Sequence, residues 1–116
     1  MKAVVCGNPE SVNNWTANDR DHILIRGIFM YSPNDFGMDS VKLEQMTKDK
    51  KIEVFGEIAP YYGGTTLSDD IWQPYLRLCE KYDIPVAVHT DGGEPRGTYS
   101  WSPKARLRLA DPYLIE

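Results

Sequence analysis

The stretch YLRLCEKYDIPVAVHT, residues 75–90, decides the fold class that we predict for this chain. Its first half belongs to a helix whose apolar residues recur with the 3.6-residue period of one buried face, namely Ile71, Tyr75, Leu78, Cys79 and Tyr82. The short connection KYDIP then leads into Pro85–Thr90, a nearly continuous apolar run that is typical of a buried parallel strand. A helix that returns so directly to a strand indicates a repeating βα architecture.

The start of this helix carries two competing signals. Ser68 is a predicted N-cap, because its hydroxyl can accept a hydrogen bond from a backbone N–H of the first helical turn. Pro74 follows soon afterwards and has no N–H to donate. It therefore predicts either that the helix begins later or that the helix is slightly kinked.

The same pattern extends toward the amino terminus. Three more apolar runs are predicted to be strands, at Ala3–Cys6, Ile23–Met30 and Ile52–Ile58. Asn8 and Pro9 predict the cap and first residue of a helix that leads through Val12 and Trp15. Strands therefore alternate with helices, which predicts an α/β fold with parallel strands joined by right-handed crossovers.

Two further helix starts fit this alternation. Asp39 or Ser40 begins a helix whose predicted buried residues are Val41, Leu43 and Met46. At the end of the chain, Asp111 followed by Pro112 predicts the start of a fourth helix.

The loops that follow the strands are long and rich in Gly, Pro and Asn, whereas those that enter the strands are short. In parallel α/β folds the loops after the strands build the functional site.

Composition limits the classes of function. The 116 residues predict one domain, 1–116, and the 41% hydrophobic and 26% charged fractions are those of a globular protein. A net charge of −4 argues against nucleic-acid binding, and no apolar run is long enough to span a membrane. The amino terminus has no secretory pattern, so Cys6 and Cys79 are predicted to be reduced thiols in a cytoplasmic protein.

Two polar residues stand at the ends of neighbouring predicted strands. Glu57 follows the largely apolar stretch IEVF after one intervening glycine, and His89 directly follows the apolar stretch IPVAV. Alternation along each strand places Phe55 with Glu57, and Ala87 with His89, on equivalent faces. Carboxylate and imidazole together suit a divalent metal site or an acid–base pair. The alternative is structural: His89 would bond to a loop and Glu57 would pair with an arginine.

Other polar features have simpler interpretations. Arg26 lies in the middle of a strand, so we expect a carboxylate partner from a neighbouring strand. His22, at the start of the same strand, is predicted to be a surface or packing residue. GGTT, residues 63–66, lacks the lysine and spacing of a phosphate loop and is predicted to be a turn.

Four segments, VFGEIAP, YLRLCEKYDIPVAVHT, YSWSP and RLADPYLIE, resemble the amidohydrolase-related family of the amidohydrolase superfamily. The resemblance implies a (β/α)₈ barrel that carries a metal-dependent hydrolase. It places Glu57 near the ligand position of the fourth barrel strand and His89 on the fifth-strand histidine. No His-x-His pair exists in this sequence, and the other family ligands do not transfer. A full barrel takes about 250 residues, so we expect a partial barrel of about four strands, truncated at both ends.

From this resemblance we expect a hydrolase lineage that acts on C–N or C–O bonds with Zn²⁺ or Mn²⁺. Since Glu57 and His89 are only two ligands, the isolated chain is expected to be weakly active or inactive. One alternative is a non-catalytic α/β module that forms a homo-oligomer through the exposed barrel-interior face. Another is a lyase or decarboxylase of the same superfamily. Neither catalytic nor substrate-binding residues can be assigned.

Overall fold

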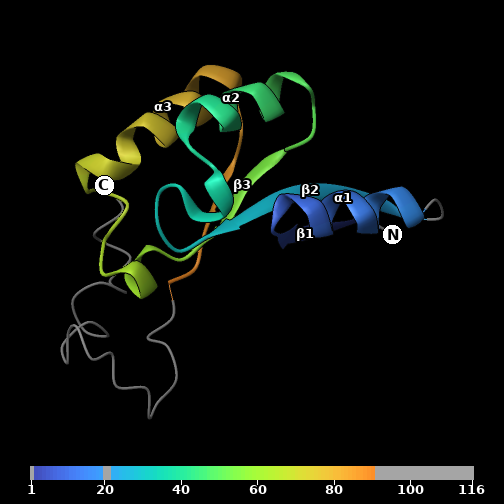
Figure 1. Ribbon diagram of the computed structural model, residues 1–116, viewed down its shortest axis with the longest axis horizontal. Helices are drawn as coiled ribbons and strands as arrows, with labels where there is room; N and C mark the ends of the chain where they lie inside the picture. Colours follow the sequence, from blue (N-terminus) through green and yellow to red (C-terminus); the bar gives the residue numbers. More distant parts are fainter. Residues whose placement is uncertain (1, 20–21, 91–116) are drawn as a thin grey trace, which may run out of the picture.

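The computed structural model describes residues 2–19 and 22–90, in which strands and helices alternate along the chain (Figure 1). The strands are β1 (Lys2–Gly7), β2 (Ile23–Met30), β3 (Val54–Ile58) and β4 (Val86–Val88). The α-helices are α1 (Pro9–Asn18), α2 (Ser40–Lys48) and α3 (Gln73–Tyr82). Three short 3₁₀ helices are η1 (Asp35–Gly37), η2 (Pro60–Gly63) and η3 (Asp70–Trp72). The predicted α/β class is confirmed, whereas the helix predicted at Asp111 lies outside the described residues.

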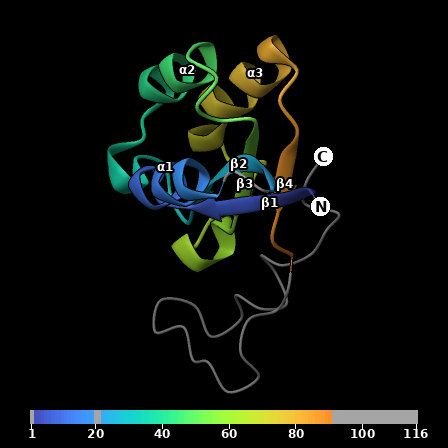
Figure 2. The ribbon, with the colours of Figure 1, turned by 90° about the vertical axis from the view of Figure 1, so that its right-hand side faces the viewer.

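All described strands are parallel, and they form one sheet in the order β1-β2-β3-β4. Each connection therefore moves one strand along in the same direction. Right-handed crossovers in this order place α1, α2 and α3 on the same face of the sheet, the arrangement seen in Figures 1 and 2. We call this the helix face and the opposite one the helix-free face, since none of the described α-helices covers it; only the short 3₁₀ helix η2 lies on that side.

The main core lies between the helix face and the helices α2 and α3. It contains Ile28, Met30, Met38, Leu43, Ile52, Phe55, Ile58, Leu67, Trp72, Tyr75 and Cys79. The Phe55 ring stacks on Tyr75 with a centroid distance of 5.7 Å, and the Trp72 ring lies 6.4 Å from Phe55. Burial raises the pKa of Cys79 to about 11, so this thiol stays protonated and packs as an apolar side chain.

The first two helices begin where the sequence predicts. The Asn8 side chain accepts a hydrogen bond from the backbone N–H of Ser11 at 2.9 Å, with Pro9 as the first helical residue of α1. At α2, the Asp39 side chain accepts from the backbone N–H of Lys42 at 2.7 Å. A side-chain acceptor thus satisfies one free backbone donor at each start.

The predicted cap at Ser68 is wrong, because α3 begins only at Gln73 after the 3₁₀ helix η3. Pro74 explains the late start: without an N–H, and with a ring that clashes one turn back, it is tolerated only in the first turn. Of the two outcomes that Pro74 predicted, the later start is therefore correct. Ile71 falls before α3 and is 48% exposed rather than buried.

One other predicted core residue, Val41, is exposed, and so is Trp15 of α1. Val41 is 75% exposed, because it lies two residues before Leu43, about 200° around the helix from the buried position. Trp15 is 50% exposed. Its ring lies against Gly7 of β1, where an added Cβ would come within 3.2 Å of the indole. Trp15 therefore covers this strand with one side of its ring.

Glu44 joins α2 to α3 through a group of charged contacts. Its Oε1 accepts hydrogen bonds from Lys81 Nζ at 2.8 Å and from the Tyr82 hydroxyl at 2.6 Å, and Lys48 Nζ lies 3.7 Å away. These contacts, the Lys81 hydrogen bond first, lower the pKa of Glu44 from its ordinary 4.5 to about 2. The carboxylate form is therefore favoured by the folded state.

We expect this contact to make stability depend on pH. Since the folded-state pKa is depressed, the stabilisation is fully present above about pH 4.5 and is lost as the pH falls toward about 2. Urea unfolding over this range should therefore show a steeper loss of stability in the wild type than in Glu44→Gln. Glu80→Gln makes the same charge change at an exposed position of α3 and should retain the wild-type slope. Equal slopes for wild type and Glu44→Gln would contradict the assignment.

Across the described ranges, no helix has the length and apolarity that a membrane span requires.

Candidate functional site

Glu57 and His89 are in direct contact at the carboxyl end of the sheet. Glu57 lies on β3, and His89 directly follows β4, the neighbouring parallel strand. The ladder continues to this point, because the His89 backbone N–H donates to the Ile58 carbonyl at 2.8 Å. The His89 Nδ1 atom and the Glu57 Oε1 atom form a hydrogen bond. The prediction that these two side chains lie side by side is therefore confirmed.

The path of β3 differs from the regular alternation expected there. Phe55 pairs with Val86 and Ile58 pairs with Val88, so three steps on β3 match two on β4. Phe55 and Ile58 consequently both pack into the core on the helix face. The prediction that Glu57 shares a face with Phe55 is wrong.

This irregularity directs the pair to the helix-free face. Glu57 immediately precedes Ile58 and His89 immediately follows Val88, which packs against the same core. Alternation places His89 opposite Val88, and Glu57 lies on the side of His89 because the two are in contact. Both site residues therefore lie on the face that would be the interior of a closed barrel.

Aromatic rings surround the histidine. The Tyr61 ring stacks on His89 at 5.8 Å between centroids with an angle of 29°, and Tyr62 lies 6.2 Å away. Tyr31 contacts Tyr62 edge-on at 5.2 Å, which extends the cluster to the end of β2. The His89 side chain is 29% exposed and Glu57 44%. The imidazole is thus held between a carboxylate and aromatic rings; its side chain is partly exposed, but the Nε2 atom is buried.

The Cys6 thiol lies close to the same carboxylate. From β1 it crosses β2 and donates a hydrogen bond to the Gly56 carbonyl of β3. Burial raises the pKa of Cys6, and the negative charge of Glu57 raises it further. The thiol is therefore protonated at neutral pH, which is consistent with its donor role and unsuited to a nucleophile or thiolate ligand.

The donor set fits a divalent cation in chemistry but not in number. Imidazole nitrogen and carboxylate oxygen are both ligands of Zn²⁺ and Mn²⁺. Within residues 2–19 and 22–90, no group of three or more His, Cys, Asp or Glu side chains could hold a metal ion. A complete site would require at least one ligand beyond the described part of the chain.

The other sequence candidates lie elsewhere. Arg26 pairs with Glu53, just before β3, so the predicted carboxylate partner is confirmed and is not Glu57. His22 is exposed and contacts Asp19 at 2.9 Å, as expected of a surface residue. Thr65, in the predicted GGTT turn, accepts a hydrogen bond from Trp72 and donates to the Pro60 carbonyl. This turn supports the core.

Sequence reasoning missed the neighbours of the pair. Tyr61 and Tyr62 lie in the segment APYY that follows the end of β3. Their position after a strand could have predicted that they lie near the site. Cys6 had no local signal, because its contact with Gly56 spans 50 positions of the sequence.

No family model matches this chain, and no curated protein or solved structure matches it either.

Proposed function

We propose that this chain forms part of an amidohydrolase-related barrel in which Glu57 and His89 belong to a divalent metal site. The observation that carries the proposal is their contact at the carboxyl end of neighbouring parallel strands, on the helix-free face. In (β/α)₈ barrels this end carries the active site. The four parallel strands in consecutive order agree with such a barrel. The reaction class would be metal-dependent hydrolysis of a C–N or C–O bond.

The hydrogen bond between the two side chains indicates a separate role for each: His89 as the metal ligand and Glu57 as the group that orients it. Glu57 engages Nδ1 of His89, so Nε2, which is buried, is the ring nitrogen that would bind a metal ion. A carboxylate in this position orients the ring and raises its basicity. The metal ion would supply activation of water and polarisation of the scissile bond. With further ligands required, we expect weak hydrolysis, or none, from this chain alone.

A second candidate is a non-catalytic module that associates through the helix-free face. Val4 on β1 is 52% exposed, and Ala87 on β4 is also exposed. Val4 and Cys6 alternate with Gly7, which faces α1, so both belong to the helix-free face. A second copy of this chain would bury these apolar side chains and give a homo-oligomer.

Metal analysis on protein purified without chelator separates the two candidates. We expect stoichiometric Zn²⁺ or Mn²⁺ in the wild type and its loss in His89→Ala, because the imidazole is the main ligand. His22→Ala is the matched control, since His22 is exposed and pairs only with Asp19 among the described residues. It should retain the metal.

Light scattering on the same samples completes the experiment. A metal-free chain that forms the same oligomer with and without His89 would reject the metal site and favour the module. A monomer that binds metal through His89 would reject the module.

A further inference from the structure

A second feature lies at the opposite end of the sheet from the Glu57–His89 pair. A cavity of about 560 Å³ opens between β2 and α1 on the helix face. Its lining residues are Asn13, Thr16, Ala17, His22, Leu24, Arg26 and Lys51. This volume lies within the range of sites for small molecules.

The polar lining of this cavity consists of hydrogen-bond donors and basic groups. Arg26, Lys51 and His22 are basic, and Asn13 adds a side-chain amide. None of the described lining residues carries a carboxylate, although the whole chain has a net charge of −4. Two of the basic lining residues are paired with carboxylates outside the lining, His22 with Asp19 and Arg26 with Glu53, whereas Lys51 forms no ion pair among the described residues.

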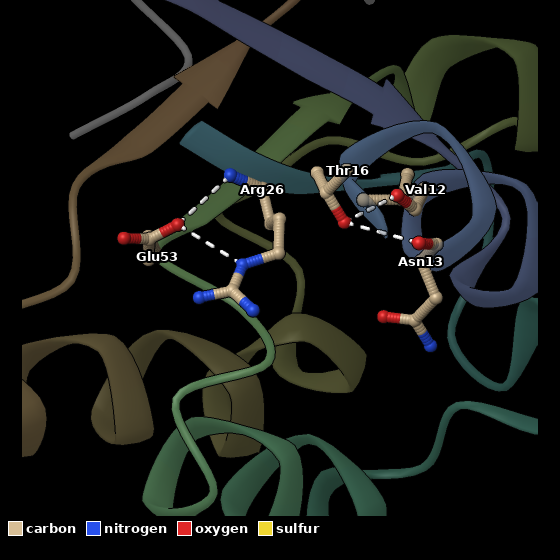
Figure 3. A network of polar contacts seen from close by, with 5 residues as sticks. All are labelled: Val12, Asn13, Thr16, Arg26 and Glu53. Carbon is tan, nitrogen blue, oxygen red and sulfur yellow. Dashed lines mark hydrogen bonds and ion pairs between the residues drawn. The ribbon is translucent and has the colours of Figure 1, made fainter. Parts of the chain in front are cut away.

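Arg26 occupies a position that the fold would normally give to an apolar residue. Ile28 and Met30, on the same face of β2, are completely buried in the core. Arg26 is instead 30% exposed and points away from the sheet into the space beside α1 (Figure 3). Such a departure from the apolar pattern is typical of functional positions.

Glu53 holds this arginine in a fixed orientation. Its Oε2 accepts hydrogen bonds from Arg26 Nε at 3.2 Å and from the Arg26 backbone N–H at 3.1 Å (Figure 3). The Glu53 backbone N–H in turn donates to the Arg26 carbonyl at 2.8 Å. Glu53 engages Nε, and the two terminal nitrogens of the guanidinium project away from the strand (Figure 3).

The α1 side of the cavity leaves its amide donor available. The Thr16 hydroxyl donates within the helix, to the Val12 carbonyl at 2.9 Å and the Asn13 carbonyl at 3.2 Å (Figure 3). Asn13 is exposed and lines the cavity from α1. Residues with donor groups from α1, from β2 and at Lys51 thus line one cavity.

We propose that this cavity binds a small organic anion through a carboxylate or phosphate group. The terminal guanidinium nitrogens of Arg26, which bond to no other residue in the described ranges, match the two oxygens of such a group, and Lys51 adds a second positive charge. Leu24 and Ala17 supply apolar contact for the rest of the molecule. The structural alternative is that Arg26 only neutralises Glu53, in which case Lys51 has no role. This inference does not depend on the proposed metal site.

The test is a titration of the full chain followed through its backbone amide NMR signals. Inorganic phosphate and succinate serve as the two probes, and sodium chloride at equal ionic strength is the reference. We expect saturable shifts at Asn13, Thr16, Leu24 and Lys51. A response to phosphate alone, or to succinate alone, identifies the anionic group that the cavity prefers. Shifts that sodium chloride reproduces would overturn the proposal.

Matched variants show whether the cavity itself is responsible. Lys51→Gln should weaken binding by about tenfold, the effect of losing one hydrogen bond between charged groups. Lys50→Gln makes the same change at an exposed neighbour outside the cavity lining and should bind as the wild type does. Arg26→Lys retains a charge beside Glu53 but removes the paired nitrogens, so it should also weaken binding. Equal affinities for wild type, Lys51→Gln and Arg26→Lys would overturn the proposal.

Discussion

Replacing Trp72 with alanine is expected to destabilise the chain by about 3–5 kcal/mol. The Trp72 side chain is completely buried and packs 5.8 Å from Tyr75 between ring centroids, at the start of α3. Its Nε1 also donates to Thr65 Oγ1 at 3.0 Å, which ties α3 to the loop after β3. Small domains have a total stability of about 5–15 kcal/mol, so this loss would unfold a substantial fraction of the molecules.

Urea unfolding followed by circular dichroism measures this effect. Trp15→Ala is the control, because Trp15 is half exposed and should cost much less than Trp72. Trp72→Phe keeps part of the ring volume and should fall between Trp72→Ala and the wild type. If the two tryptophan-to-alanine variants were equally stable, the core would not be centred on Trp72.

A single methyl group at Gly27 is expected to be nearly as damaging. A Cβ at this position would lie 2.4 Å from the Gly56 carbonyl oxygen and 2.6 Å from Cys6 Sγ. The first contact is with backbone, so β2 and β3 must move apart in the middle of the sheet. Overpacking of a well-packed interior costs about 1–3 kcal/mol, and a backbone clash places Gly27→Ala at the upper end.

The Gly27→Ala substitution should also disturb the Glu57–His89 pair. Gly56 directly precedes Glu57, so displacement of its carbonyl also shifts the carboxylate relative to His89. We expect Gly27→Ala to lower the urea midpoint and to move the amide signals of Glu57 and His89. Gly37→Ala provides the comparison: Gly37 has a φ of +66° but no atom within 4 Å of an added Cβ. It should cost only the backbone strain, about 1 kcal/mol, and leave the site signals in place.

The elements that the sequence predicts best are those with strong local patterns. β2 spans Ile23–Met30 as predicted, because apolar residues fill it on both sides of Arg26. The N-cap at Asn8 is also correct, and of the two predicted starts Asp39 and Ser40 the structure has Asp39 as the cap, since capping depends on residues within one turn. Nearness of Glu57 and His89 followed from the parallel order of strands, which places all carboxyl ends at one edge.

What the sequence could not predict depends on fit between distant segments. The irregular pairing of β3 with β4 places Glu57 and Phe55 on opposite faces of the sheet, and no residue pattern in the sequence predicts this irregularity. The basic cavity joins Asn13, Arg26 and Lys51, which come from three separate segments. Only their positions in space show that they share a wall.

The double engagement of Arg26 by Glu53 also bears on how β2 and β3 find their alignment. Strands that are apolar on both faces can slide past each other with little change in burial, so their pattern fixes the alignment only weakly. Here one residue exchanges both main-chain and side-chain hydrogen bonds with its counterpart. Sliding by two positions would break all of these bonds and leave a guanidinium facing apolar neighbours. The Arg26–Glu53 ion pair therefore favours the observed register of the two strands over shifted registers.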